Sequence, residues 1–186
     1  MMVLTLLKIW DVRSARVAHA LQHHDSVNSV AFSGDGRLLA SGSDDWTVKV
    51  WEVETGRLVG GPLQHDDAVQ VVAFSPDGRL IASGGSFKTI TLWSATTWLS
   101  VQTLLVGASV KDLAFNLDGS RLMSISSDGK VKLWEAPTWR ESGNVKARGW
   151  YPAPIPAFSP DGRLLALGTT DGAVRLQPLT ALNAHK

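Results

Sequence analysis

Short apolar runs alternate with polar turns along most of the chain. In residues 27–51, a run ending at Phe32 is followed by a turn at 34–36, a second run, a turn at 43–45 and a third run ending at Trp51. Runs of this length, rich in Val, Leu, Ile and Phe and bounded by Asp, Gly and Ser, are typical of antiparallel strands joined by hairpins. The Asp-Gly pair of the first turn tolerates a left-handed backbone. The pattern therefore predicts a β-meander.

The same succession recurs at a nearly constant spacing. The Phe of the first run recurs as Phe32, Phe74, Phe115 and Phe158, with separations of 42, 41 and 43 residues. The Trp of the third run recurs as Trp10, Trp51, Trp93 and Trp134, with separations of 41, 42 and 41 residues. The turn recurs as SGDGR (33–37), SPDGR (75–79), NLDGS (116–120) and SPDGR (159–163). Three hairpin-linked runs and a variable fourth in each such period predict the blades of a β-propeller.

The period places the individual strands. We expect strands near 27–32, 38–42, 47–51 and 57–63 in the first full copy, and near 155–158, 164–168 and 172–177 in the last. Residues 3–12 should be the third strand of a copy that lacks its first two, and residues 16–21 an outer fourth strand. Three prolines in 146–156 remove backbone donors, so we predict an irregular loop there.

These motifs resemble those of the WD-repeat family. The shared features are an apolar strand, a Ser/Pro-Asp-Gly turn, Leu-Ala-Ser-Gly, Ser-Asp-Asp and an alternating strand that ends in Trp. The copies lie at about 23–56, 65–98, 106–139 and 149–182, after an N-terminal part-repeat at 3–21. The resemblance implies an all-β fold of four-stranded antiparallel blades, here one β-propeller domain over residues 1–186. It implies little about function, because one fold hosts many roles.

The number of blades raises the question of ring closure. Rings of the family usually have seven or eight blades, whereas this chain encodes four and an orphan strand. Terminal blades of an open ring leave an apolar face exposed. We therefore expect a partial ring: either a fragment of a longer propeller or a half-ring that pairs with a second copy. A closed four-bladed ring, with residues 16–21 completing the 155–177 blade, is the third alternative.

Composition narrows the classes of partner. The chain has 18 basic and 17 acidic residues, a net charge of +1, and no block of like charge. This balance argues against a broad nucleic-acid or membrane-binding surface. The absence of cysteine excludes disulfides and thiolate metal sites and fits a reducing compartment. The start MMVLTLLK has neither the features of a signal peptide nor the length of a membrane span, so we expect a cytoplasmic protein.

The resemblance also implies a buried hydrogen-bond chain of His, Ser, Asp and Trp in each blade. By spacing, the members are His23, Ser41, Asp45 and Trp51 in the first copy, His65, Ser83 and Trp93 in the second, and Ser124, Asp128 and Trp134 in the third. Phe87 replaces Asp in the second copy, and Val106 replaces His in the third. The fourth retains only Asp171, with Gly149, Leu167 and Gln177 at the other places. We interpret these sets as structural and not as hydrolase triads, because they recur with Trp and lack a nucleophile elbow.

Candidate binding residues lie on the face that carries the loops entering each first strand, which by family resemblance is the usual partner-binding face. Trp46 stands where the family has Gly, and Phe87 lies in the equivalent turn of the next copy; aromatic residues are enriched in binding hot spots. By resemblance, the further partner contacts are Ser26, Asn28 and Asp44, then Ala68, Gln70 and Ser86, then Ser109, Lys111 and Ser127. In the fourth copy they would be Pro152, Pro154 and Thr170. An alternative is that Trp46 and Phe87 only cap a neighbouring blade. Trp98 and Trp139, in the opposite turns, are expected to pack over the sheet edge.

We expect a non-catalytic scaffold that presents propeller loops to a protein partner. The alternative is an enzyme or small-ligand module at the ring centre, but only Lys111 and Asp112 are ionisable on the inner strands. His23-His24-Asp25 and His65-Asp66-Asp67 lie on neighbouring blades without a third ligand-rich loop, so we predict no metal site and no cofactor.

Overall fold

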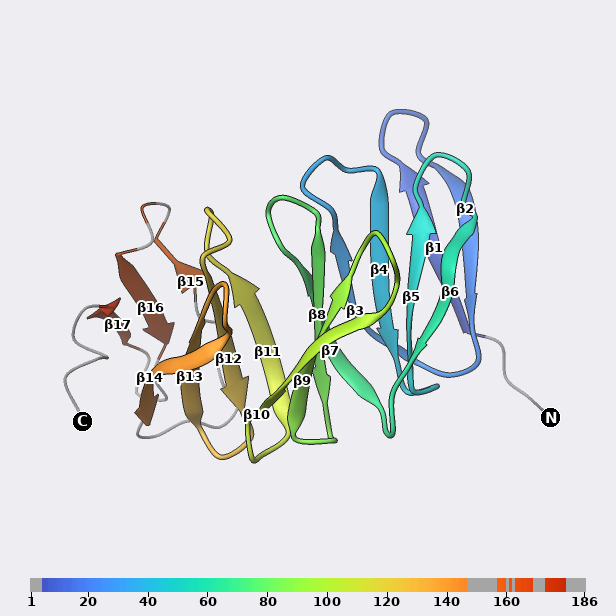
Figure 1. The fold of residues 1–186 in the computed structure, drawn as a ribbon. Helices are drawn as coiled ribbons and strands as arrows, with labels where there is room; N and C mark the ends of the chain where they lie inside the picture. The colour runs from blue at the N-terminus through green and yellow to red at the C-terminus, as the bar shows by residue number, and fades with distance from the viewer. Residues whose placement is uncertain (1–4, 147–156, 160, 162, 169–172, 180–186) are drawn as a thin grey trace.

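The described residues form 17 β-strands in five antiparallel sheets, as a computed structural model shows (Figure 1). The structure describes residues 5–146, 157–159, 161, 163–168 and 173–179. The predicted fold class, an all-β protein built of four-stranded antiparallel blades, is confirmed. The loop predicted at 146–156 lies, apart from Lys146, outside the described residues.

Three complete blades form the middle of the molecule, each with its strands in chain order from the innermost to the outermost. The first consists of β3 (Val27–Phe32), β4 (Leu38–Ser43), β5 (Thr47–Glu52) and β6 (Leu58–Gln64). The second consists of β7 (Val69–Phe74), β8 (Leu80–Gly85), β9 (Thr89–Ser94) and β10 (Ser100–Leu105). The third consists of β11 (Val110–Phe115), β12 (Arg121–Ser126), β13 (Lys130–Glu135) and β14 (Arg140–Lys146).

The sheets at the two ends have fewer strands. β1 (Thr5–Asp11) and β2 (Arg16–His23) form a two-stranded sheet that precedes the first blade. β15 (Ala157–Phe158), β16 (Leu164–Gly168) and β17 (Val174–Pro178) form a three-stranded sheet that follows the third. β2 pairs with β1 along its whole length, so the alternative in which residues 16–21 complete the last blade is wrong.

Side-chain hydrogen bonds fix the turn between the first two strands of a blade. The Ser33 hydroxyl donates to the Asp35 carboxylate at 2.7 Å and accepts from the Leu38 N–H at 2.9 Å. Gly36 follows with φ +71°, a conformation that glycine adopts without steric cost. The second blade repeats the turn with Ser75, Asp77 and Gly78. The repeated Asp-Gly motif is therefore the direct cause of the repeated hairpin.

The core lies between consecutive blades. Val48 and Val50 on β5 are fully buried and share a cluster with Val72 and Phe74 on β7 of the next blade. Gly42 on β4 permits this approach, since a Cβ there would lie 2.6 Å from Val69 Cγ1. Strands buried on both faces have no need of polar alternation, which explains their continuous apolar runs.

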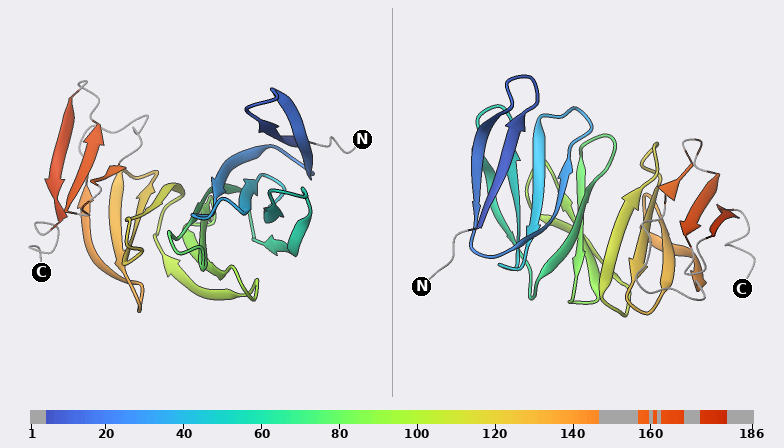
Figure 2. Two further views of the ribbon diagram at one scale, coloured as in Figure 1. Left: turned by 90° about the horizontal axis from the view of Figure 1, so that it is seen from above. Right: turned by 180° about the vertical axis from the view of Figure 1, so that it is seen from behind.

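The blades follow one another along an open arc. Seen from above, the N-terminal hairpin and the C-terminal sheet lie at the two ends of the arc, well apart (Figure 2). The alternative of a closed four-bladed ring is therefore wrong, and the described residues form an open partial ring, as expected.

Both ends of the arc expose residues whose equivalents are buried in the middle. Val174 and Leu176 on β17 are 71% and 64% exposed, whereas Val131 and Leu133 at the same places on β13 are 1% and 2% exposed. The difference arises because a following blade covers β13 and, among the described residues, none covers β17.

Candidate functional site

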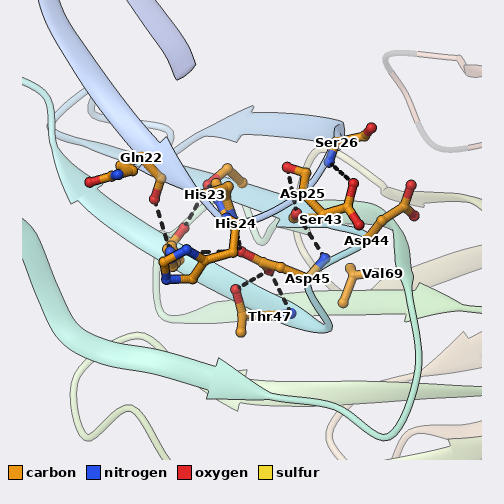
Figure 3. A network of polar contacts seen from close by, with 12 residues as sticks. Gln22, His23, His24, Asp25, Ser26, Ser43, Asp44, Asp45, Thr47 and Val69 are labelled. Carbon is orange, nitrogen blue, oxygen red and sulfur yellow. Dashed lines mark hydrogen bonds and ion pairs between the residues drawn. The ribbon is translucent and has the colours of Figure 1, made fainter. Parts of the chain in front are cut away.

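The hydrogen-bond chain of the first blade links four side chains from three strands and a turn. Two of them, His23 and Asp45, are labelled in Figure 3. His23, at the end of β2, lies with Nε2 2.7 Å from Ser41 Oγ and Nδ1 2.8 Å from Asp45 Oδ2. The Trp51 indole N–H donates to the same Ser41 oxygen at 2.8 Å. A carboxylate only accepts, so Nδ1 carries the imidazole proton and Nε2 accepts from the serine hydroxyl. Burial lowers the pKa of His23, although Asp45 opposes this effect, and a neutral ring results.

Asp45 accepts further hydrogen bonds from the residues around it. Its carboxylate accepts the Thr47 hydroxyl at 2.6 Å and the His24 N–H at 2.9 Å. Burial alone would raise the pKa of Asp45, but these bonds and the contact with His23 hold it well below its usual range. Lys49 lies 3.7 Å from Asp45 and donates to the Gln22 carbonyl at 2.8 Å. The Asp45 carboxylate is therefore charged, and its oxygens accept hydrogen bonds from groups within the fold.

Lys49 and Thr47 were missed in the sequence analysis. Lys49 is only 7% exposed although it carries a charge. The one available signal was its place in the Val-Lys-Val segment of an otherwise apolar strand. A buried cation needs a partner, and Asp45 lies four residues before Lys49 in the sequence.

The second blade holds the same chain without the carboxylate. His65 Nε2 lies 2.9 Å from Ser83 Oγ, and the Trp93 indole donates to that oxygen at 2.7 Å. Phe87, at the place of the missing Asp, stacks on the His65 ring with the ring centres 4.6 Å apart. Burial lowers the pKa of His65 to about 4. Phe87 is thus half-buried and stacks on His65 of its own blade.

The third blade retains only the bond from Trp134 to Ser124, at 3.0 Å. Asp128 instead accepts from the Ser126 hydroxyl at 2.6 Å and pairs with Lys130 at 2.8 Å. The hydrogen bond from Lys130, followed by that from Ser126, lowers the pKa of Asp128 to about 2. In the fourth copy, Gly149 and Asp171 lie outside the described residues.

Three predicted contact residues form one polar cluster between the first two blades. Asn28 Nδ2 donates to Asp44 Oδ1 at 2.6 Å and to the Val69 carbonyl at 3.0 Å. Gln70 Nε2 donates to the same Asp44 oxygen at 3.3 Å. The cluster joins β3, the β4–β5 turn and β7, and Asn28 remains exposed. These residues therefore connect blades and face solvent at the same time.

The other predicted contact residues do not join this cluster by a side-chain hydrogen bond, although the Ser26 carbonyl accepts the Asp44 backbone N–H at 2.9 Å. Ser26, Lys111 and Ser127 are exposed, and Ser86 is half-buried. Pro152, Pro154 and Thr170 lie outside the described residues. Among the described residues, the side chains of these four residues therefore stand apart from the Asn28–Asp44–Gln70 cluster.

Trp46 is a large, exposed aromatic residue on this face. Its side chain is 53% exposed, and its backbone has φ +66°. Lys88 and Gly129, at the equivalent places of the next two blades, also have positive φ, so the turn itself imposes this conformation. A left-handed backbone costs a residue with a Cβ about 1–2 kcal/mol relative to glycine. Trp46 therefore combines local strain with an exposed aromatic surface.

Trp98 and Trp139 lie in the turns at the opposite end of the blades. Trp139 is buried and packs edge-to-face on Phe115, with the ring centres 5.8 Å apart. The ring of Trp98 lies over Gly60, where a Cβ would clash with it. Both side chains thus contribute to packing between neighbouring elements.

Two features are absent from the described residues. Within these residues no group of three or more His, Cys, Asp or Glu side chains is placed to hold a metal ion. No helix long and apolar enough to cross a membrane occurs in this part of the chain.

Comparison with known proteins identifies the repeats. The family model "WD domain, G-beta repeat" matches residues 15–52, 58–94 and 99–135. The WD repeat-containing protein SL1-17 of Schistosoma mansoni is 50% identical over 54 residues, which are 29% of this chain and 18% of that protein. The guanine nucleotide-binding protein subunit beta of Zea mays is 41% identical over 56 residues, 28% of this chain and 14% of that protein. The vegetative incompatibility protein HET-E-1 of Podospora anserina is 59% identical over 34 residues, 18% of this chain and 2% of that protein. The chain thus matches less than a fifth of the length of each of these relatives.

Proposed function

The chain belongs to the WD-repeat family, and from this premise we propose that it is a non-catalytic scaffold that binds a protein partner through the loops around Trp46. WD repeats generally mediate protein–protein interaction. The observation that carries the proposal is Trp46 itself, a strained and half-exposed aromatic residue where glycine would relieve the strain. Strain at an exposed residue indicates a role other than stability.

The neighbours of Trp46 suit a protein partner. Asp44, Asn28 and Gln70 supply polar atoms that are already held in place by one another. A rigid aromatic anchor beside preorganised polar groups is the usual composition of an interaction hot spot.

Substitution of Trp46 tests this proposal. Immobilised wild-type protein and the variant Trp46→Gly are each used to capture proteins from a lysate of the source cells. We expect a specific partner to be retained by the wild type and lost by Trp46→Gly, because the anchor is removed without strain.

The matched control is Leu117→Ala. Leu117 is 72% exposed and lies in the β11–β12 turn, at the opposite end of the strands. Equal capture by the wild type and both variants would contradict a role for Trp46.

The geometry of the Ser-His-Asp set does not support hydrolytic chemistry. Ser41 is fully buried, and its oxygen already bonds to both His23 and Trp51. A nucleophile must be reachable by its substrate. On the inner strands, Asp112 is partly buried, burial raises its pKa, and its carboxylate accepts only the adjacent Leu113 N–H at 2.8 Å. No converging partner for Asp112 occurs among the described residues.

The proposal includes completion of the ring by further blades, supplied either by a second copy or by further sequence of a longer protein. Its support is the apolar surface that the described residues leave open at both ends of the arc. Light scattering after gel filtration tests self-association. A stable mass near twice 20.0 kDa indicates paired half-rings, whereas a mass of 20.0 kDa at every concentration excludes them.

A further inference from the structure

β10 is the outermost strand of the second blade, and its outer edge has no strand beside it in the described part of the chain. Seen from above, it lies on the convex side of the arc, away from both ends (Figure 2). We propose that this edge pairs antiparallel with β10 of a second copy of the protein, joining two four-stranded blades into one continuous sheet. The inference goes beyond the proposed scaffold function, because neither Trp46 nor the ends of the arc take part in the contact.

Exposed apolar side chains are concentrated along β10. Leu99, in the turn before the strand, is 67% exposed, and Val101 and Leu105 are 57% and 73% exposed. Polar residues stand at the equivalent places of the other complete blades: Arg57 and Gln64 in the first, Arg140 and Ser142 in the third. The apolar edge is therefore a property of this blade and not of the repeat.

The outer edges of the other two complete blades are protected against pairing. Proteins commonly protect an open edge with a proline or with charged side chains. β6 contains Pro62, and β14 begins with Arg140 and Glu141. β10 contains neither a proline nor a charge, and its register with β9 is unbroken from Gln102 to Leu105. It therefore presents a regular, uncharged template for a further strand.

Backbone groups of β10 are directed to the open edge. The Val106 N–H donates to the Lys88 carbonyl at 3.1 Å, so the N–H and C=O of Leu105 point away from β9, by the alternation of an antiparallel pair. The Leu105 carbonyl accepts from Lys132 Nζ at 3.5 Å, which is long for a hydrogen bond. Lys132 lies closer to Glu141, at 2.9 Å. A backbone N–H arriving at this edge is therefore the better donor to Leu105.

The opposite face of β10 holds the strand in place. Leu104 is buried in the cluster shared with the third blade, and Gln102 Nε2 donates to the Thr138 carbonyl at 3.1 Å. These contacts lie on the side of the strand toward the third blade and leave the outer edge free. The edge is thus preorganised, which reduces the entropy lost on pairing.

The charge and the symmetry of the edge favour a second copy as its partner. Because β10 carries no charge, two identical strands can face each other without like-charge repulsion. Antiparallel pairing about a two-fold axis reverses one strand, so Leu99 and Val101 of one copy lie at the end that Leu105 occupies in the other. Such a contact is self-complementary and closes at two copies.

A charged substitution on β10 tests the proposal. Light scattering after gel filtration should show the wild-type mass rising with concentration from 20.0 kDa toward twice that value. Leu105→Lys should raise the dissociation constant of the dimer about 10-fold, because each dimer loses two apolar contacts and gains two charges at the paired edge. The matched control is Gln64→Lys, at the same exposed place on β6, which should associate as the wild type does.

A cysteine cross-link locates the contact, because the protein has no cysteine of its own. Thr103 is exposed in the middle of β10, and Asn144 is exposed at the same place on β14. With a short bismaleimide reagent, Thr103→Cys should give a covalent dimer, whereas Asn144→Cys should remain monomeric.

Two results would overturn the proposal. One is a mass of 20.0 kDa at every concentration, without a cross-linked dimer of Thr103→Cys. The other is a doubled mass that persists in Leu105→Lys. Loss of that mass in Leu176→Lys, a substitution on β17 at the end of the arc, would then assign it to paired half-rings. Neither result bears on Trp46, whose capture experiment tests the scaffold function separately.

Discussion

Single residues decide how each blade satisfies its buried polar groups. The first blade keeps a complete chain from Asp45 through His23 and Ser41 to Trp51. The second replaces the carboxylate by an aromatic ring, since Phe87 covers the His65 face instead of bonding to its nitrogen. The hydrogen-bond chain can therefore lose one member when stacking compensates for it.

The lowered pKa of His65 predicts an acid-sensitive fold. The unfolded chain takes up this proton near the ordinary value of 6.5, whereas the folded chain does so near 4. Between these values the unfolded state binds more protons, so the free energy of unfolding should decrease as the pH falls from 6.5 to 4, by about 3 kcal/mol at most. Urea denaturation at a series of pH values measures this slope. His65→Gln should reduce it, and an unchanged slope would show that His65 is not its source.

The strain at Trp46 predicts a difference between two small substitutions. Glycine adopts φ +66° freely, whereas alanine keeps the steric cost of a Cβ. Trp46→Gly should therefore be more stable to urea than Trp46→Ala by about 1 kcal/mol. Equal midpoints for the two variants would mean that the turn relaxes and stores no strain.

Single-residue reasoning from the sequence reached the members of the buried chains but not all their contacts. The spacing of Ser41 and Trp51 could be read from the repeat, because both lie within one sheet. The stacking of Phe87 on His65 could not, since the pattern reveals a missing Asp but not what the replacement touches. Lys49 was overlooked because its partner lies in a turn and its second acceptor, Gln22, belongs to the preceding hairpin.

At the scale of elements, the closeness of consecutive blades depends on glycine. A Cβ at Gly84 on β8 would lie 2.7 Å from Val110 Cγ1 on β11, as one at Gly42 would approach Val69. In the third blade the equivalent place holds Ile125, which is buried in the cluster next to β16. The blade interfaces are thus built from different pairs of side chains at the same positions.

Gly84→Ala should force the second and third blades apart. Overpacking of a core by one methyl group costs about 1–3 kcal/mol, and the backbone on both sides is fixed by strand pairing. Thermal or urea unfolding measures the loss. Ser86→Ala, two residues along and half-buried, is the control that should change stability little. A neutral Gly84→Ala would show that β11 can shift.

The strands and hairpins followed from local sequence, because Asp-Gly turns and apolar runs act within one sheet. The cluster of Asn28, Asp44 and Gln70 needed the structure, because it depends on how one blade is rotated against the next. The family resemblance placed these three on one face but gave no indication that they bond to each other.

For the whole molecule, the same strand position has opposite surroundings in the middle and at the end of the arc. Val131 is 1% exposed and Val174 is 71% exposed. Val131→Ser should lower the free energy of unfolding by about 2–4 kcal/mol through a lost core contact and a buried hydroxyl. Val174→Ser should change it by less than about 0.5 kcal/mol. Comparison of their urea midpoints measures this difference. A large effect of Val174→Ser would show that the C-terminal face is covered in solution.

The open arc also determines how the molecule can bend. In a closed ring, the small rotations at the blade interfaces must cancel, so each interface restrains the others. In an arc no such condition applies, and the rotations at successive interfaces add along the chain. We therefore expect the distance between Trp10 at one end and Leu176 at the other to vary more than distances within a single blade. A partner that bridges the two ends would fix a shape that no single blade interface can fix.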